Sequence, residues 1–309
     1  MSPKVSVVVP VFNSAQTLDA LLGRLESCLK DGWTPFELIF VDDGSSDHSW
    51  QVLSRLAKMN SNVKAVRLSR NFGQHYAVLA GVQRATGDIT AIMDCDLQDQ
   101  PEDMTKILTR LAEGFDIVVT QTVSHHQSLI RRILRRIYFH LVSWSSGIRL
   151  EQNLGTMVAF NQKVREGFLA IRERNRHTNL LLAWLGYKRA SVTVQKLPST
   201  TRKSSYSLRK LFVQAVTGTI SSSTRILTLA VFLGSFIVAG SVLVALFVIR
   251  NGIALGAQNG WVSLMLVLLM LGGMILVFLG VIGFYVGKLF EQLRERPLFL
   301  IDVEIGMPY

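Results

Sequence analysis

Cysteine is scarce in this chain of 309 residues, which contains only Cys28 and Cys95. The two lie far apart in sequence, so they indicate neither a disulfide framework nor a zinc site, and they fit a reducing compartment. Acidic residues are also few, because 22 Asp and Glu stand against 33 Lys and Arg and leave a formal net charge of +11. Such an excess indicates an anionic partner, either nucleic acid or an anionic membrane surface.

Charged residues are absent from two long stretches near the C-terminus, residues 226–249 and 261–287. A helix rises about 1.5 Å per residue, so each stretch is long enough to cross the ~30 Å hydrocarbon core of a bilayer. We therefore expect two transmembrane helices, whose glycines would allow close packing. The basic segments Arg131–Arg136 and Arg202–Lys210 precede these stretches. We accordingly expect them to meet lipid and expect no nucleic-acid partner.

The flanking basic residues predict the orientation of the two stretches. Arg225 precedes the first and Lys288 and two arginines follow the second, whereas the loop of residues 250–260 carries one basic residue. By the positive-inside tendency, both ends of the chain are expected in the cytoplasm. We expect no signal peptide, because the apolar run Val5–Val11 is too short for one. The expectation is a multi-pass protein of the inner (cytoplasmic) membrane.

Strand and helix signals alternate along the first 120 residues, and this alternation predicts an α/β fold with a mostly parallel sheet. The first strand is β-branched and continuous, as expected for a strand buried on both faces. Strands are expected at residues 5–11, 36–41, 63–68, 89–93 and 115–120, and helices from Asn13 or Ser14 to about Lys30 and at 47–59, 74–85 and 101–112.

Unusual polar residues follow three of these strands. The carboxyl ends of parallel strands meet at one edge of a sheet, where open α/β sheets bind ligands. We therefore expect the three loops to form one site. They are Pro10-Val11-Phe12-Asn13, the segment Asp42–Asp47, and Asp94–Gln98.

The segment Asp94–Gln98 is the most informative of the three, because it holds two carboxylates and an amide within five residues. Hard oxygen ligands of this kind suit Mg²⁺ or Mn²⁺, which usually bridge to a substrate phosphate. The alternative is a solvated acidic loop that caps the next helix, with Pro101 in its first turn. An isolated Asp-x-Asp favours that alternative. The two companion loops favour the metal site here.

The second loop mixes binding and turn residues. Asp42 ends its strand, where it could accept hydrogen bonds from a base or a ribose. The adjacent carboxylates of Asp42 and Asp43 repel each other and need a partner, which favours a binding role for both. Gly44 allows a tight turn, and Ser46 or Asp47 is interpreted as a cap of the following helix.

Four segments in this order and spacing resemble the inverting GT-A glycosyltransferases of family 2. They are Val7–Asn13, Asp42–Asp47, Asn71–His75 and Asp94–Gln98. The chain resembles most closely the polyprenyl-phosphate glycosyltransferases, which include dolichol-phosphate mannose synthases, bactoprenol glucosyltransferases and the enzyme that loads 4-formamido-arabinose onto undecaprenyl phosphate. The resemblance covers almost the whole chain, including the paired apolar stretches.

The resemblance implies a Rossmann-like GT-A domain that transfers a sugar, with inversion, from a nucleotide sugar to a polyprenyl phosphate such as undecaprenyl phosphate. A UDP-sugar is favoured as donor, and Mg²⁺ or Mn²⁺ is the implied cofactor. Asn71–His75 would shape the pocket floor, or would be a simple loop and helix start. The implied nucleotide-binding residues are Pro10, Val11, Asn13, Asp42, Asp43 and Asp94, the metal ligands Asp94, Asp96 and Gln98, and the catalytic residues Asp94 and Asp96.

The rest of the expected organisation concerns the membrane. Residues 128–144 carry apolar side chains on one side and arginines largely on the other, which is the pattern of an interfacial helix. A core helix with a solvated basic face is the alternative, and residues 207–223 could form a second interfacial helix. The expected parts are a donor-binding core at 1–125, an acceptor side at 126–225, a transmembrane hairpin at 226–287 and a cytoplasmic tail at 288–309.

The acceptor side departs from the family pattern. Thr122-Val123 stands where relatives usually carry a Val-Arg-like pair, and Gln152 and Val158 stand where they usually carry Asp and Arg. Ser199–Tyr206 lacks the first Arg, the Gly and the Lys of the Arg-x-x-Gly-x-Ser-Lys-Tyr pattern. The candidates to supply the missing charge at the acceptor phosphate, or to contact lipid headgroups only, are Arg131, Arg202 and Lys203.

Two other functions stay open at this point. A hydroxyl-bearing lipid acceptor would need a general base, for which Glu151 and His125 are the nearby candidates. A nucleotide-binding membrane partner without turnover is the other alternative, and the Asp94/Asp96 pair argues against it. A homo-oligomer is compatible with the sequence.

Overall fold

The structure is a computed structural model of the full chain. It describes residues 3–122, 154–174, 176–197, 260–294 and 296–307, together with a few helical residues between 232 and 243. The expected interfacial helices, most of the first apolar stretch, and the acceptor candidates Arg131, Arg202 and Lys203 lie outside the described residues.

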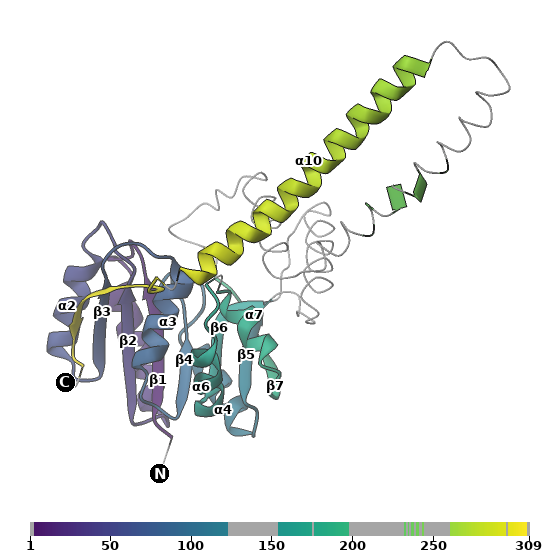
Figure 1. Ribbon diagram of the computed structural model, residues 1–309. Coiled ribbons are helices and arrows are strands. Elements are labelled where there is room, and N and C mark those ends of the chain that lie inside the picture. Colours follow the sequence, from purple (N-terminus) through teal and green to yellow (C-terminus); the bar gives the residue numbers. More distant parts are fainter. Residues whose placement is uncertain are drawn as a thin grey trace. The chain divides into compact units, whose positions relative to one another are not determined.

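Eight strands form one sheet in the order β7-β5-β6-β4-β1-β2-β3-β8. Figure 1 shows this sheet from β7 at one edge across to β3 near the other. β1 pairs in parallel with β2 and β4, as do β2 with β3 and β5 with β7. β6 runs antiparallel between β4 and β5, and β8 runs antiparallel to β3. The strands are β1 (Val5–Val11), β2 (Phe36–Asp42), β3 (Val63–Leu68), β4 (Ile89–Ile92), β5 (Ile117–Thr122), β6 (Leu154–Asn161), β7 (Arg189–Val194) and β8 (Ile301–Ile305).

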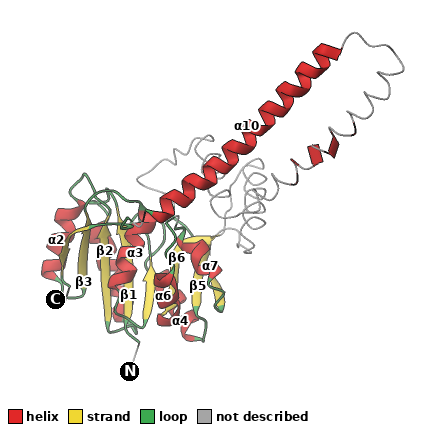
Figure 2. Ribbon diagram, in the orientation of Figure 1, coloured by secondary structure: helices red, strands yellow, loops and turns green. Residues whose placement is uncertain are grey.

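Helices cover both faces of the sheet (Figure 2). One buried cluster joins the sheet to α1, α2 and α4, and a second cluster on the other face joins it to α3, α6 and α7. The strands β1 and β2 are buried along their whole length, as their continuous apolar sequence predicts. The helices are α1 (Leu18–Lys30), α2 (Ser49–Met59), α3 (Gln74–Arg84), α4 (Asp103–Ala112), α6 (Gln162–Ala170) and α7 (Thr178–Trp184).

The expected α/β fold with a mostly parallel sheet is confirmed, and so are the first five strands to within about two residues. The first helix begins later than predicted, at Leu18. The reason is that the Asn13 side chain bonds the neighbouring loop instead of capping this helix, and a turn closes between the Thr17 N–H and the Ser14 carbonyl.

The C-terminal segment joins the sheet, although the sequence places it in a tail. Ile301–Ile305 forms β8 along the free edge of β3, and Arg84 pairs with Glu304 at 2.8 Å. Leu298 and Phe299 pack against the cluster of buried residues that contains α3. The strand is short and alternates apolar with acidic residues, so its strand signal is weak on its own.

A separate compact unit contains the long helix α10 (Gly260–Leu293) of 34 residues, which we describe by itself. Its most apolar window, Met270–Gly287, has a mean hydropathy of 2.2, and none of the window is buried inside the protein. By length and composition it is the one helix among the described residues that could cross a membrane. It contains the predicted stretch 261–287, whereas the pairing with stretch 226–249 stays a prediction.

Candidate active site

The carboxyl ends of β1, β2 and β4 lie next to one another, because β1 pairs with both of the other strands. Three loops therefore meet at one edge of the sheet, as the sequence predicts. Hydrogen bonds join them. The Thr17 hydroxyl donates to the Cys95 carbonyl at 2.8 Å, and the Asp43 N–H donates to the Val11 carbonyl at 2.9 Å. This edge is where open α/β sheets bind ligands.

The loop Asp94–Gln98 gathers oxygen atoms at this edge. The Gln98 backbone N–H donates to Asp96 Oδ1 at 3.0 Å, and Gln98 Nε2 donates to Asp96 Oδ2 at 2.7 Å. Leu97 makes this turn possible in a left-handed conformation with φ of 58°. A bulky residue rarely adopts that conformation, and such strain is found most often at functional sites.

Asp94 is buried and is affected by the negative charges of Asp96 and Asp99. Burial raises the pKa of its carboxyl group to about 6, and the charges of Asp96 and Asp99 act in the same direction. Lys196 acts in the opposite direction. Gln74 Nε2 donates to Asp94 Oδ1 at 2.6 Å and so fixes the carboxylate from the start of α3. Carboxylates whose charges repel one another are stabilised when a cation binds between them.

The donor set of this loop fits Mg²⁺ or Mn²⁺. Asp94 and Asp96 would offer carboxylate oxygens, and the Gln98 amide would offer its oxygen while its nitrogen donates to Asp96. The described residues contain no group of three or more His, Cys, Asp or Glu that could hold a metal. Two carboxylates and an amide form an incomplete shell. This suits Mg²⁺, which keeps waters and substrate phosphates among its ligands.

Asp42 has an acceptor atom for which the described residues supply no hydrogen-bond donor. Its side chain is fully buried, its Oδ1 accepts from the Ser45 N–H at 3.1 Å, and its Oδ2 has no hydrogen-bond partner among the described residues. Arg67 Nε lies 3.7 Å from Oδ2, and burial raises the pKa of the carboxyl group. A buried acceptor without a donor costs free energy. An N–H or O–H group of a ligand would remove this cost.

Asp43 positions a loop. It is almost fully buried, and burial raises the pKa of its carboxyl group, whereas hydrogen bonds lower that pKa. Its Oδ1 accepts from the Phe72 N–H at 2.7 Å and its Oδ2 from the Gly73 N–H at 2.9 Å. The partner that the sequence requires for this carboxylate is therefore the backbone of the segment Asn71–His75. A contact between Asp43 and a nucleotide stays a prediction.

Asn13 joins the first two loops. Its Oδ1 accepts from the Ser46 N–H at 2.8 Å, and its own N–H donates to Ser45 Oγ at 3.0 Å. Its φ of 51° is left-handed, a conformation that Asn tolerates better than most residues. Asp47 Oδ1 accepts from the Ser49 N–H at 3.0 Å, but the N-cap residue of α2 is His48, one position after the predicted cap.

Pro10 and Val11 lie inside β1 and are buried, so their side chains line the sheet and present no surface to a ligand. The next residue, Phe12, is 37% exposed at the same edge. Any nucleotide contact of Pro10 or Val11 would have to use the backbone.

Of the residues that depart from the family pattern, Val158 can be placed. It is 1% exposed in β6 and pairs with Ile92 and Val119 in the sheet. The valine belongs to the core, and its side chain cannot contact an acceptor phosphate. Thr122 ends β5. The described residues do not include Gln152, Ser199 and the base candidates Glu151 and His125.

Residues that sequence reasoning missed complete this edge. Gln74 touches Asp94, and Thr156 at the start of β6 donates to Asp99. Lys196 follows β7, with its Nζ 3.5 Å from Asp99 Oδ1. Gln74 falls within the Asn71–His75 segment, which the resemblance singled out. The other residues come from strands whose pairing the sequence does not reveal.

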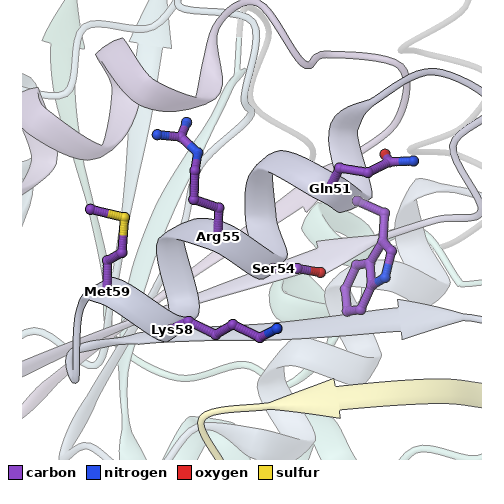
Figure 3. A pocket seen from close by; sticks show the side chains of 6 residues that line it. Gln51, Ser54, Arg55, Lys58 and Met59 are labelled. Atoms are coloured by element: carbon purple, nitrogen blue, oxygen red, sulfur yellow. The ribbon is translucent and has the colours of Figure 1, made fainter.

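A hollow of about 570 Å³ lies elsewhere, along one side of α2 (Figure 3). It contains no carboxylate that could hold a metal. Its lining residues are Trp50, Gln51, Ser54, Arg55, Lys58 and Met59.

Two known proteins resemble this chain along almost its whole length. An uncharacterized glycosyltransferase of Synechocystis sp. is 32% identical over 100% of this chain and 98% of its own length. The undecaprenyl-phosphate 4-deoxy-4-formamido-L-arabinose transferase of Pseudomonas aeruginosa is 33% identical over 96% of this chain and 89% of its own length.

Solved structures share the fold at lower identity. A mannosyltransferase from Pyrobaculum calidifontis, solved in complex with GDP-Man and Mn²⁺, matches with a TM-score of 0.52 at 19% identity, over 73% of this chain and 65% of its own. Mannosyl-3-phosphoglycerate synthase from Rubrobacter xylanophilus matches with a TM-score of 0.53 at 18% identity, over 73% of this chain and 74% of its own. A profile described as glycosyl transferase family 2 matches residues 6–166. The chain therefore belongs to glycosyl transferase family 2 and is a sugar-transferring enzyme with the GT-A fold.

Proposed function

We propose that the protein transfers a sugar, with inversion, from a nucleotide sugar to a polyprenyl phosphate of the undecaprenyl type at the cytoplasmic face of the membrane. A UDP-sugar is the favoured donor and Mg²⁺ or Mn²⁺ the cofactor. The observation that carries the donor half is that the loop of Asp94, Asp96 and Gln98 lies at the same sheet edge as Asp42 and the loop after β1. The acceptor class rests on the name of the Pseudomonas relative.

The donor side of the reaction follows from the described side chains. The nucleotide contact of Asp42 requires the base or ribose to reach Oδ2, which is buried at the end of β2 and lies 3.7 Å from Arg67 Nε. A hydrogen bond there would orient the nucleotide. Gln74 holds the Asp94 carboxylate. Asp94, Asp96 and Gln98 would hold the metal, which neutralises charge that develops on the leaving nucleoside diphosphate. A group held in place by protein contacts loses little freedom on the way to the transition state.

The acceptor needs positioning more than activation. A phosphate oxygen is already anionic near neutral pH, so no side chain has to remove a proton before it attacks the sugar. A hydroxyl acceptor would require a general base. Basic side chains are the groups that hold a phosphate. The requirement for a phosphate on the lipid therefore distinguishes the two acceptor classes.

The membrane location rests on α10 and on the charges that follow it. A lipid-soluble acceptor is reached most directly by a protein anchored in the same bilayer, and α10 is long and apolar enough to provide an anchor. Arg294 and Arg296 follow the helix, and basic residues stay on the cytoplasmic side. We place both ends of the chain there, and we propose that the stretch 226–249 crosses the membrane as well.

The test is a transfer assay with the full-length protein in detergent or native membranes. Labelled UDP-sugars and GDP-sugars are incubated with Mn²⁺ and undecaprenyl phosphate, and label in the lipid fraction is counted. We expect transfer from one donor, none to undecaprenol, and loss of transfer when EDTA removes the metal. Asp96→Asn should abolish transfer. Failure of every donor to label the phosphorylated lipid would contradict the proposal.

A further inference from the structure

The segment after β7 is fastened to the loop that carries the oxygen ligands. The Leu197 N–H donates to the Gln98 carbonyl at 2.9 Å, and Gln100 Nε2 donates to the Gln195 carbonyl at 3.4 Å. Lys196 lies between these two contacts. Its position beside the loop is therefore set by the backbone on both sides of it.

Lys196 faces a buried carboxylate without bonding it closely. Asp99 is 2% exposed, its Oδ2 accepts from Thr156, and its Oδ1 has no hydrogen-bond partner in the described part of the chain. The Lys196 ammonium lies 3.5 Å from Oδ1, beyond the usual length of a charged hydrogen bond, and its side chain is 33% exposed. An ammonium carries three N–H donors, and this contact saturates none of them.

Another lysine of the same protein shows the arrangement of a purely structural counter-ion. Lys64 Nζ bonds Glu37 Oε2 at 2.6 Å, and the two side chains are only 10% and 4% exposed. Lys196 is more exposed and lies farther from its carboxylate. Lys4 also lies 3.5 Å from Glu37 Oε2, but its Nζ donates to Thr86 Oγ1 at 2.6 Å. The Lys196 ammonium makes no hydrogen bond to the described residues, so its donors are available to a ligand at the edge of the sheet.

We propose that Lys196 is a phosphate-binding residue of the active site. Its ammonium donates to a phosphate oxygen of the bound substrate, beside the loop Asp94–Gln98. The inference rests on the proposed function. The negative charges of Asp94, Asp96 and Asp99 would repel a substrate phosphate, and Lys196 offsets part of that repulsion from within the same cluster. The phosphate can belong to the donor diphosphate or to the acceptor lipid.

The test compares Lys196→Met with Lys196→Arg and with Lys188→Met, a matched control for an exposed lysine just before the start of β7. Binding of UDP and of GDP with Mn²⁺ is measured by calorimetry, and the KM for undecaprenyl phosphate is measured in the transfer assay. We expect Lys196→Met to raise either the Kd of the nucleotide or the KM for undecaprenyl phosphate about tenfold, as the loss of one charge-assisted hydrogen bond predicts. Lys196→Arg should stay within about threefold of wild type.

The two readouts identify the source of the phosphate. Weaker nucleotide binding assigns Lys196 to the donor, and a raised lipid KM with unchanged nucleotide binding assigns it to the acceptor. If the nucleotide Kd and the lipid KM of Lys196→Met both stay within about twofold of those of Lys188→Met, the inference is overturned. Transfer by the wild type would still uphold the proposed function in that case. Conversely, the nucleotide-binding assay tests the role of Lys196 even when no lipid acceptor is found, because it does not depend on the acceptor.

A loss of stability has its own control, because Lys196→Met leaves Asp99 without its counter-ion. The pair Asp99→Asn and Asp99→Asn/Lys196→Met removes the buried charge from both proteins. The double variant should still show the binding or KM defect relative to the single variant. Equal values in these two folded proteins would make Lys196 only a counter-ion of Asp99.

Discussion

Gln74 acts on the site through Asp94. It donates to Asp94 Oδ1 at 2.6 Å from the first residue of α3 and is otherwise exposed. We predict that Gln74→Ala lowers the kcat of transfer about tenfold to a hundredfold, because one hydrogen bond to a charged group contributes about 1.5–3 kcal/mol. The free energy of unfolding should stay within about 0.5 kcal/mol of the wild-type value, as for other surface changes.

Gln51→Ala, an exposed glutamine of α2, is the matched control and should leave kcat unchanged. Equal kcat values for Gln74→Ala and Gln51→Ala would show that Asp94 needs no support from α3.

Glu37 is a stability residue at the amino ends of the strands. Its Oε1 accepts from Ser6 Oγ at 2.5 Å and its Oε2 pairs with Lys64 at 2.6 Å. Burial raises the pKa of the carboxyl group, but the hydrogen bonds from Lys64, Ser6 and Thr86 outweigh it and lower the pKa to about 2. We predict that Glu37→Gln costs about 3 kcal/mol of unfolding free energy at neutral pH, because it leaves Lys64 buried and unpaired.

The pH dependence of this difference has a definite sign. A depressed carboxyl pKa contributes stability above the unfolded value of 4.5, and that contribution is lost as the pH falls toward about 2. Denaturant unfolding from pH 7 to pH 2 should therefore show wild type and Glu37→Gln converging. Glu113 forms an exposed pair with Arg110. The unfolding free energy of Glu113→Gln should therefore differ from that of wild type by less than about 1 kcal/mol at every pH.

The sequence indicates the residues of the candidate site that lie near strand ends and misses those that reach it by long-range contacts. Asp42, Asp94 and Asp96 are visible because each lies at the end of an apolar strand or within four residues of it. Lys196 is invisible because its relation to Asp99 depends on the position of β7 in the sheet, across 97 residues of chain. Pairing between distant strands leaves no local pattern, so only the structure can supply it.

At the scale of the elements, the turn between β2 and α2 depends on Gly44. Its φ is +66°, and a Cβ built there would lie 2.6 Å from the Arg70 carbonyl carbon and the Asn71 nitrogen. These are backbone atoms of the loop that Asp43 holds, so they cannot move aside alone. We predict that Gly44→Ala destabilises the protein by about 2 kcal/mol or more.

Thermal or denaturant unfolding measures this cost, and the transfer rate should fall with it because the loop that carries Gln74 is displaced. Gly23→Ala is the control, since no atom lies within 4 Å of its Cβ and it sits inside α1. That variant should be more stable by about 0.5–1 kcal/mol. A Gly44→Ala protein as stable as Gly23→Ala would contradict the account of this turn.

The elements of the first half follow from local pattern, and those of the second half do not. Continuous β-branched runs with helices between them predict β1 to β5 well, because a strand buried on both faces has a distinctive sequence. β8 differs, since Ile301–Ile305 carries two acidic residues and is stabilised by pairing with β3 and by the Arg84–Glu304 contact. β8 is therefore a strand because of its contacts with β3 and Arg84, and its own sequence does not predict it.

At the scale of the whole molecule, the proposed membrane location depends on the apolar helix α10. α10 exposes large apolar side chains such as Leu279 and Phe290, which are 57% exposed each. Water disfavours such surface at about 25 cal/mol per Å², and lipid removes that cost. A helix of 34 residues is about 50 Å long, so its ends reach beyond a ~30 Å hydrocarbon core.

We therefore predict that the middle of α10 lies in lipid and its C-terminal end in water. In native membranes, a water-soluble maleimide should label Leu293→Cys and leave Leu279→Cys at the background set by the native cysteines. Leu279 lies inside the apolar window Met270–Gly287, whereas Leu293 is the last residue of the helix. After denaturation in SDS both variants should label alike, which controls for expression. Equal labelling in intact membranes would place α10 outside the bilayer, and the proposed anchoring beside a lipid acceptor would then need another part of the chain.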